Sequence, residues 1–116
     1  MELLKKTAVE QRKALLNKEV SALELVEETF KQIENLDDKI GAYNSLTKEY
    51  AIETAKKVDE KIAKNEELPL MAGIPLALKD NMNMIGSKTT ASSKILENFV
   101  SPFDATVTKK LKENLV

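Results

Sequence analysis

The chain has 116 residues, and its 18 basic and 19 acidic side chains nearly cancel, to a formal net charge of −1. That balance provides no strong field for nucleic acid, and two tyrosines and three phenylalanines offer few stacking platforms. The lack of histidine and cysteine excludes a Ser-His-Asp triad, imidazole metal ligands, thiolate nucleophiles and disulfides within these residues.

No stretch of about 18 apolar residues is present that could cross a membrane. The N-terminal sequence MELLKKTAVEQRK lacks the apolar core of a signal peptide. We therefore expect no membrane association and a cytoplasmic location. With only three glycines, the chain contains neither a P-loop nor a dinucleotide-binding fingerprint. The remaining options are chemistry by lysine, hydroxyl and carboxylate groups, or no chemistry at all.

Charge and proline are unevenly distributed. Residues 1–68 contain 12 basic and 15 acidic side chains and no proline, whereas residues 69–116 contain 6 basic and 4 acidic side chains and all three prolines. We predict a single partial domain over residues 1–116. In it, residues 1–68 form amphipathic helices, and residues 69–116 form a strand, a loop and further helices.

Three helices are predicted in the first part. TAVE at residues 7–10 has the spacing of a capping box and predicts a helix from about Ala8 to Asn17. SALE at residues 21–24 is a second capping box, and the helix that it begins should end near Leu36, before two aspartates. Its apolar face is formed by Val20, Leu23, Val26, Phe30 and Ile33. GAYNSLT at 41–47 is compatible with a short strand, and a third helix follows from about Lys48 to Lys64.

Beyond Pro69 the period changes. Apolar residues at 74, 76 and 78 alternate with Pro75, Ala77 and Lys79, which predicts a strand. Because proline cannot donate a hydrogen bond, either this is an edge strand or it begins only at Leu76. NMIGSKTTASS at 83–93 is typical of a loop that turns at Gly86. Ser92 or Ser93 is expected to cap a short helix that runs to Asn98.

A last helix should start with Asp104 as its N-cap and carry Val107, Leu111 and Leu115. The order of elements predicts an α/β fold, helix-rich, with one or two short strands. Two strands are too few for a self-sufficient sheet, so we expect the sheet to be incomplete.

Lys79 is the residue most in need of an explanation. A charge-free run from 70 to 78 ends abruptly in Lys79 and Asp80. The lysine either marks where a strand reaches water, or serves as a general base inside the fold. The second role requires a lysine pKa that falls from about 10.4 to about 7, which burial away from carboxylates can produce. A nearby hydroxyl cluster fits either turn and cap chemistry or the polar lining of the same site: Ser87, Thr89, Thr90, Ser92 and Ser93.

The segments MAGIPLALKDNMNMIGSKTTASSKILENF (71–99), DATVTKKLKE (104–113) and VSALEL (20–25) carry a family resemblance. They resemble the N-terminal part of the amidase signature family, and within it the A subunits of bacterial glutamyl-tRNA(Gln) amidotransferases. The resemblance implies an α/β/α fold with a mixed sheet and a Ser-cis-Ser-Lys catalytic triad. By the same resemblance, Lys79 is the general base of that triad.

The resemblance also implies a reaction. Glutamine is hydrolysed, and the ammonia converts Glu-tRNA(Gln) to Gln-tRNA(Gln) in a complex with B and C subunits. ATP and magnesium are used by the B subunit, and we expect no cofactor in this chain. Both triad serines belong to a Gly- and Ser-rich segment that these residues do not contain, and Ser92 and Ser93 do not replace them. We therefore expect the 116 residues alone to be inactive.

Two other interpretations remain open. One is part of a stand-alone amidase that acts on other amides, and the other is a helix-rich interaction module without catalysis. The interaction module would fold as a monomer. If strands are missing instead, apolar surface around residues 70–78 and along the last helix stays uncovered, and we expect the isolated chain to self-associate.

Overall fold

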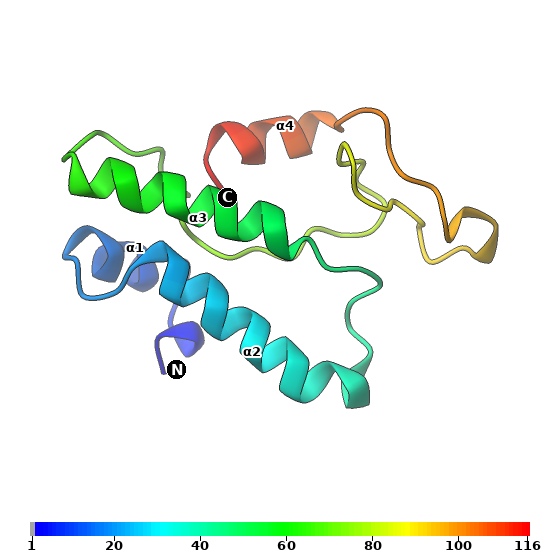
Figure 1. The fold of residues 1–116 in the computed structure, drawn as a ribbon, viewed down its shortest axis with the longest axis horizontal. Helices are drawn as coiled ribbons and strands as arrows, with labels where there is room; N and C mark the ends of the chain where they lie inside the picture. Colours follow the sequence, from blue (N-terminus) through cyan, green and yellow to red (C-terminus); the bar gives the residue numbers. More distant parts are fainter. Residues whose placement is uncertain (1) are drawn as a thin grey trace.

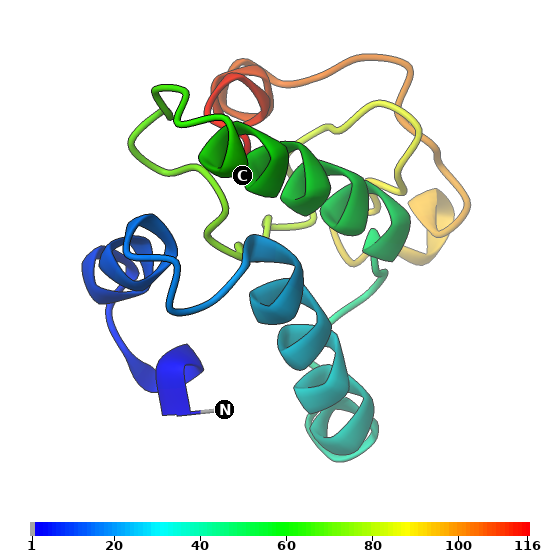
Figure 2. The ribbon, with the colours of Figure 1, turned by 60° about the vertical axis from the view of Figure 1, so that its left-hand side comes forward.

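The computed structural model describes residues 2–116. Its elements are the 3-10 turns η1 (Glu2–Lys5) and η2 (Lys94–Leu96) and the helices α1 (Ala8–Leu16), α2 (Ala22–Ile40), α3 (Lys48–Ala63) and α4 (Thr106–Glu113). Helix α3 lies between α2 and α4 in both views of the ribbon (Figures 1 and 2). A long irregular stretch from α3 to α4 extends past the end of α3 (Figure 1).

The predicted starts of α1 and α2 are confirmed. The Thr7 and Ser21 side chains accept hydrogen bonds from the backbone N–H groups of Glu10 and Glu24, whose carboxylates bond back to the capping residues. Helix α2 has a further anchor in α3. The Asp59 carboxylate accepts hydrogen bonds from the first two N–H groups of α2 at 2.7 and 3.0 Å. The first turn of α2 is therefore fixed directly to its neighbour.

The predicted end of α2 near Leu36 is wrong, because the helix continues to Ile40. Gly41 ends it in the left-handed conformation at φ 64°, and its N–H donates to the Asp37 carbonyl at 2.7 Å. The Asp37 carboxylate then accepts from the backbone N–H groups of Ala42 and Tyr43. Asp37 thus stabilises the turn after the helix, and glycine, the usual residue at this position, stops it.

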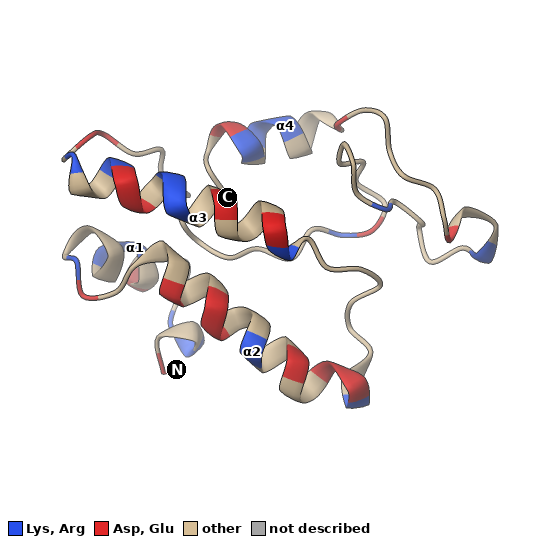
Figure 3. Cartoon of the chain, viewed as in Figure 1, with Lys and Arg blue, Asp and Glu red and all other residues tan. Residues whose placement is uncertain are grey.

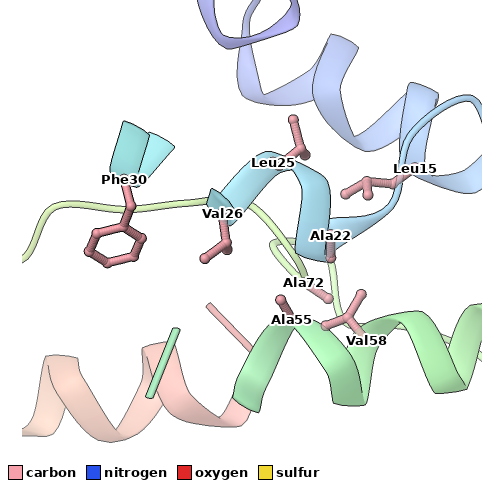
Figure 4. Close-up of a cluster of buried hydrophobic side chains, with 8 residues drawn as sticks. All are labelled: Leu15, Ala22, Leu25, Val26, Phe30, Ala55, Val58 and Ala72. Atoms are coloured by element: carbon pink, nitrogen blue, oxygen red, sulfur yellow. The ribbon is translucent and has the colours of Figure 1, made fainter. Parts of the chain in front are cut away.

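The hydrophobic core lies where α1, α2, α3 and the chain just before residue 74 meet. Figure 4 shows the buried side chains: Leu15, Ala22, Leu25, Val26, Phe30, Ala55, Val58 and Ala72. Gly73 follows Ala72 with φ +76°, and a Cβ there would lie 3.1 Å from Val58 and 3.2 Å from Ala22 and from Leu15. The chain passes between three helices here because this residue has no side chain.

Neither predicted strand forms, so the expected α/β sheet is absent from residues 2–116. Residues 41–47 are an irregular connection, and residues 74–79 form neither helix nor strand. The one β-bridge in the described part of the chain pairs Lys88 with Val100. The alternating pattern at 74–79 predicts a strand, but a strand also needs a neighbour, which these residues do not provide.

The last part of the chain departs from prediction in its caps. Ala105, and not Asp104, precedes α4, and the Asp104 carboxylate accepts from the Ile85 N–H at 2.8 Å and from Lys112 Nζ at 2.9 Å. Ser93 does precede η2, but its side chain makes no cap bond, and the turn is shorter than the helix predicted to run to Asn98. Asp104 therefore ties the loop at Ile85 to α4.

Charged side chains are spread over the helices, with acidic residues recurring along α2 and lysines prevailing on α4 (Figure 3). Of the helices in residues 2–116, none has the length and apolar character needed to cross a membrane.

Candidate functional site

Lys79 stands at the end of segment 74–79 and is exposed. It lines a cavity of about 590 Å³. One side of the cavity is apolar and comes from α2 and α3, with Val26, Phe30, Ile33, Tyr50 and Ala51. The other side comes from the loop at 42–47, the segment 73–80 and parts of 82–92. The strongest candidate from the sequence thus lines a hollow between α2, α3 and the loops that follow them.

Asp80, the next residue, forms no ion pair with Lys79. Its carboxylate accepts hydrogen bonds from the Thr90 N–H at 2.8 Å, from the Thr90 hydroxyl, and from Asn44 Nδ2 at 2.8 Å. These bonds, with the Thr90 hydroxyl contributing most, lower the pKa of Asp80. The Asp80 carbonyl also accepts from the Ala91 N–H at 2.7 Å. One residue therefore joins three separate segments at the cavity.

The turn held by Asp80 has an unusual backbone. Ala91 and Ser92 both have positive φ, at 47° and 56°, and the Ser93 N–H donates to the Thr90 carbonyl at 2.8 Å. Two successive positive φ values are those of a type I′ turn, where Asn and Gly are usual. For other residues the left-handed region costs about 1–2 kcal/mol each. The bonds to Asp80 help to offset that cost.

Asn44 completes the arrangement. Its Nδ2 donates to Asp80 Oδ2 and also to Ser92 Oγ, the latter at 3.0 Å. Asn44, Asp80 and Ser92 all line the same cavity as Lys79. The loop at 42–47 and the turn at 90–93 are thereby fixed to each other across one wall.

The hydroxyl cluster predicted from the sequence is divided by the structure. Ser87 and Ser92 line the cavity, whereas Thr89 and Thr90 are buried. The Thr90 hydroxyl donates to the Asp80 carboxylate and so stabilises the turn, whereas Thr89 Oγ1 has no hydrogen-bond partner among the described residues. Thr90 therefore stabilises a turn, whereas Ser87 and Ser92 are part of the cavity lining.

No feature of the sequence pointed to Asn44. Asp80 was noticed only as the neighbour of Lys79, and its partners lie 10 and 36 residues away in the chain. A polar residue in a GAYNSLT context is ordinary turn chemistry, so no local signal distinguishes it. In residues 2–116, no group of three or more acidic side chains is arranged to hold a metal ion.

Comparison with known proteins places this chain in a family. The profile of the family named Amidase matches residues 24–114, and the chain belongs to that family. The chain is 49% identical to the A subunit of the glutamyl-tRNA(Gln) amidotransferase of Carboxydothermus hydrogenoformans, over 97% of its length. The protein of the same name from Chlamydia muridarum is 44% identical over 93% of this chain. That from Clostridium botulinum strain Okra is 48% identical over 97% of this chain.

Two solved structures are similar in fold. Both come from work on a vestigial protein complex and the evolutionary origins of an s-triazine catabolic enzyme, and one is an inhibitor-bound complex. They are 31% identical to this chain, with TM-scores of 0.89 and 0.88, and cover 94% of it. The chain spans 24% of those solved chains and 22–23% of the curated relatives.

Proposed function

We propose that this chain is the N-terminal portion of the glutamine-hydrolysing A subunit of a glutamyl-tRNA(Gln) amidotransferase, with Lys79 as general base. The observation that supports this proposal most directly is that Lys79 is exposed and lines the cavity between α2, α3 and the loops. The higher identity to the amidotransferase proteins, 44–49%, than to the solved s-triazine-related chains, 31%, favours this reaction over that of another amidase.

In the proposed mechanism, the neutral lysine accepts a proton through a bridging serine, and a second serine attacks the side-chain amide of glutamine. An acyl-enzyme forms, ammonia leaves, and water releases glutamate. Both serines come from the remainder of the family fold. The 116 residues by themselves are proposed to be inactive.

The expected sheet fits the same proposal. The backbone N–H groups of Leu76, Ala77 and Leu78 make no hydrogen bond within residues 2–116. Extended backbone with free donors and acceptors is a template for strand pairing. In the complete α/β/α fold, segment 74–79 would pair with strands of the remaining chain and place Lys79 at the end of its own strand.

The proposal includes partners. The complex would contain B and C subunits and act on Glu-tRNA(Gln) in the cytoplasm. ATP and magnesium would be used by the B subunit. Glutamine is the substrate proposed for the cavity at Lys79.

The test uses a chimera in which this chain replaces the matching segment of the Carboxydothermus protein, assembled with its partner subunits. Loss of a general base costs about 10²- to 10⁴-fold in rate. We expect Lys79→Ala to reduce glutamine hydrolysis by that factor. Lys88 lines the same cavity, so Lys88→Ala is the matched control and should keep its activity within about twofold. Glutaminase activity that survives in Lys79→Ala would refute the assignment.

A further inference from the structure

Ser92 lines the cavity and carries a hydroxyl whose hydrogen-bonding capacity is only partly used. Ser92 Oγ accepts from Asn44 Nδ2 at 3.0 Å, so one of its lone pairs is already used. Its own proton has no acceptor among the described residues, and Ser92 lines the cavity together with Lys79. A serine hydroxyl is both donor and acceptor, and here the donor half remains available.

The position of that hydroxyl is determined by several independent bonds. Asn44 Nδ2 bridges Ser92 Oγ to Asp80 Oδ2, and the Ser92 N–H donates to Thr90 Oγ1 at 3.2 Å. Thr90 in turn donates both its N–H and its hydroxyl to Asp80. The positive φ of Ser92, which glycine or asparagine would adopt more readily, is maintained within this network. Backbone strain of this kind persists where surrounding contacts over-determine it, as at ligand-binding sites.

We propose that Ser92 contacts the substrate, donating its O–H to an oxygen of a small amide substrate bound beside Lys79. Asn44 and Asp80 are positioning residues that fix the direction of this donor. The inference rests on the proposed function, because it places a substrate in this cavity. It assigns Ser92 no covalent role, since no general base among the described residues contacts its hydroxyl.

Two neighbouring glycine substitutions test the hydroxyl. Ser92→Gly and Ala91→Gly each relieve one positive φ, but only the first removes a hydroxyl. In the active chimera we expect Ser92→Gly to raise the KM for glutamine about 3- to 10-fold, the range of one lost hydrogen bond, with kcat within about twofold. Ala91→Gly should leave both constants within about twofold of the parent.

A third variant separates substrate contact from mere anchoring of the loop. If Ser92 only anchors Asn44, then adding Ser92→Gly to Asn44→Ala removes no further interaction with Asn44 and should leave KM unchanged. If Ser92 contacts the substrate, adding Ser92→Gly to Asn44→Ala should raise KM by a further factor of about three or more. Thermal unfolding of each variant shows that the fold is retained.

The outcomes are distinct. Equal KM values in Ser92→Gly and Ala91→Gly would overturn the inference, as would a fall in kcat alone or the absence of a further rise in the Asn44→Ala background. All of these require an active parent chimera. An inactive parent, or an active Lys79→Ala variant, counts instead against the proposed function.

Discussion

Gly73 offers the sharpest test of how the core is assembled. Substitution by alanine meets two costs. The first is the left-handed backbone at φ +76°, which costs a residue with a Cβ about 1–2 kcal/mol. The second is contact with Val58, Ala22 and Leu15 at 3.1–3.2 Å, and overpacking of this kind costs about 1–3 kcal/mol. We expect Gly73→Ala to lower the free energy of unfolding by about 2–5 kcal/mol.

Gly86→Ala is the matched control. Gly86 has φ +74°, but an added Cβ would meet no heavy atom within 4 Å. This variant should lose only the backbone part, about 1–2 kcal/mol. Urea unfolding followed by circular dichroism gives both values from the midpoints, provided that the slopes agree. Equal midpoints for the two variants would show that the side chains around Gly73 rearrange to accept a Cβ without a free-energy cost, and would refute the predicted overpacking.

Four further predictions concern separate features. Asp59→Ala should lower the free energy of unfolding by about 1.5–3 kcal/mol in urea titrations, because two N–H groups at the start of α2 lose a charged acceptor, and an unchanged midpoint would contradict this. Arg12→Lys should cost about 1 kcal/mol by the same measurement, because Nη1 donates to the Pro69 and Leu70 carbonyls at 2.7 and 2.9 Å while Nη2 donates to the Leu68 carbonyl at 3.5 Å, and a single ammonium cannot replace both nitrogens, whereas a neutral result would show that one nitrogen suffices. The lowered pKa of Asp80 contributes stability that is present above its ordinary value of 3.8 and is lost as the pH falls through the lowered value, so midpoints below about pH 4 should fall less steeply for Asp80→Asn than for the parent. The isolated chain should self-associate in sedimentation experiments through exposed apolar residues such as Leu76, and Leu76→Lys should weaken this, while a monomer at all concentrations would count against it.

The features predicted correctly from the sequence depend on residues that are close together in the chain. The capping boxes before α1 and α2 need only four consecutive residues, and both form as expected. Helix α3 was also predicted to within a residue at its end, because its apolar stripe and its length are sufficient. The error at the end of α2 came from treating an aspartate pair as a stop, where glycine at 41 was the stronger local signal.

The strands failed for a different reason. Alternation at 74–79 predicts a strand, but a strand is defined by hydrogen bonds to a neighbour that can be far away in sequence. Asp104 failed in a similar way, because Ile85 and Lys112 compete for its carboxylate and no local pattern reveals such partners. The same holds at the cavity: the sequence singled out Lys79, which lines it and whose catalytic role stays a prediction, but the bonds of Asn44 to Asp80 and Ser92 could not be predicted.

The bonds of Asp80 bear directly on the role proposed for Lys79. An adjacent carboxylate would ordinarily be the nearest partner for the ammonium and would stabilise its charged form. Here that carboxylate is engaged by Thr90 and Asn44 and forms no ion pair with Lys79. In the proposed complete fold, strand pairing along 74–79 would cover Leu76 and bring further chain next to Lys79. A general base requires an amine that is free to accept a proton. Asp80 therefore serves the site twice, by holding the turn at 90–93 and by being unavailable to its neighbour.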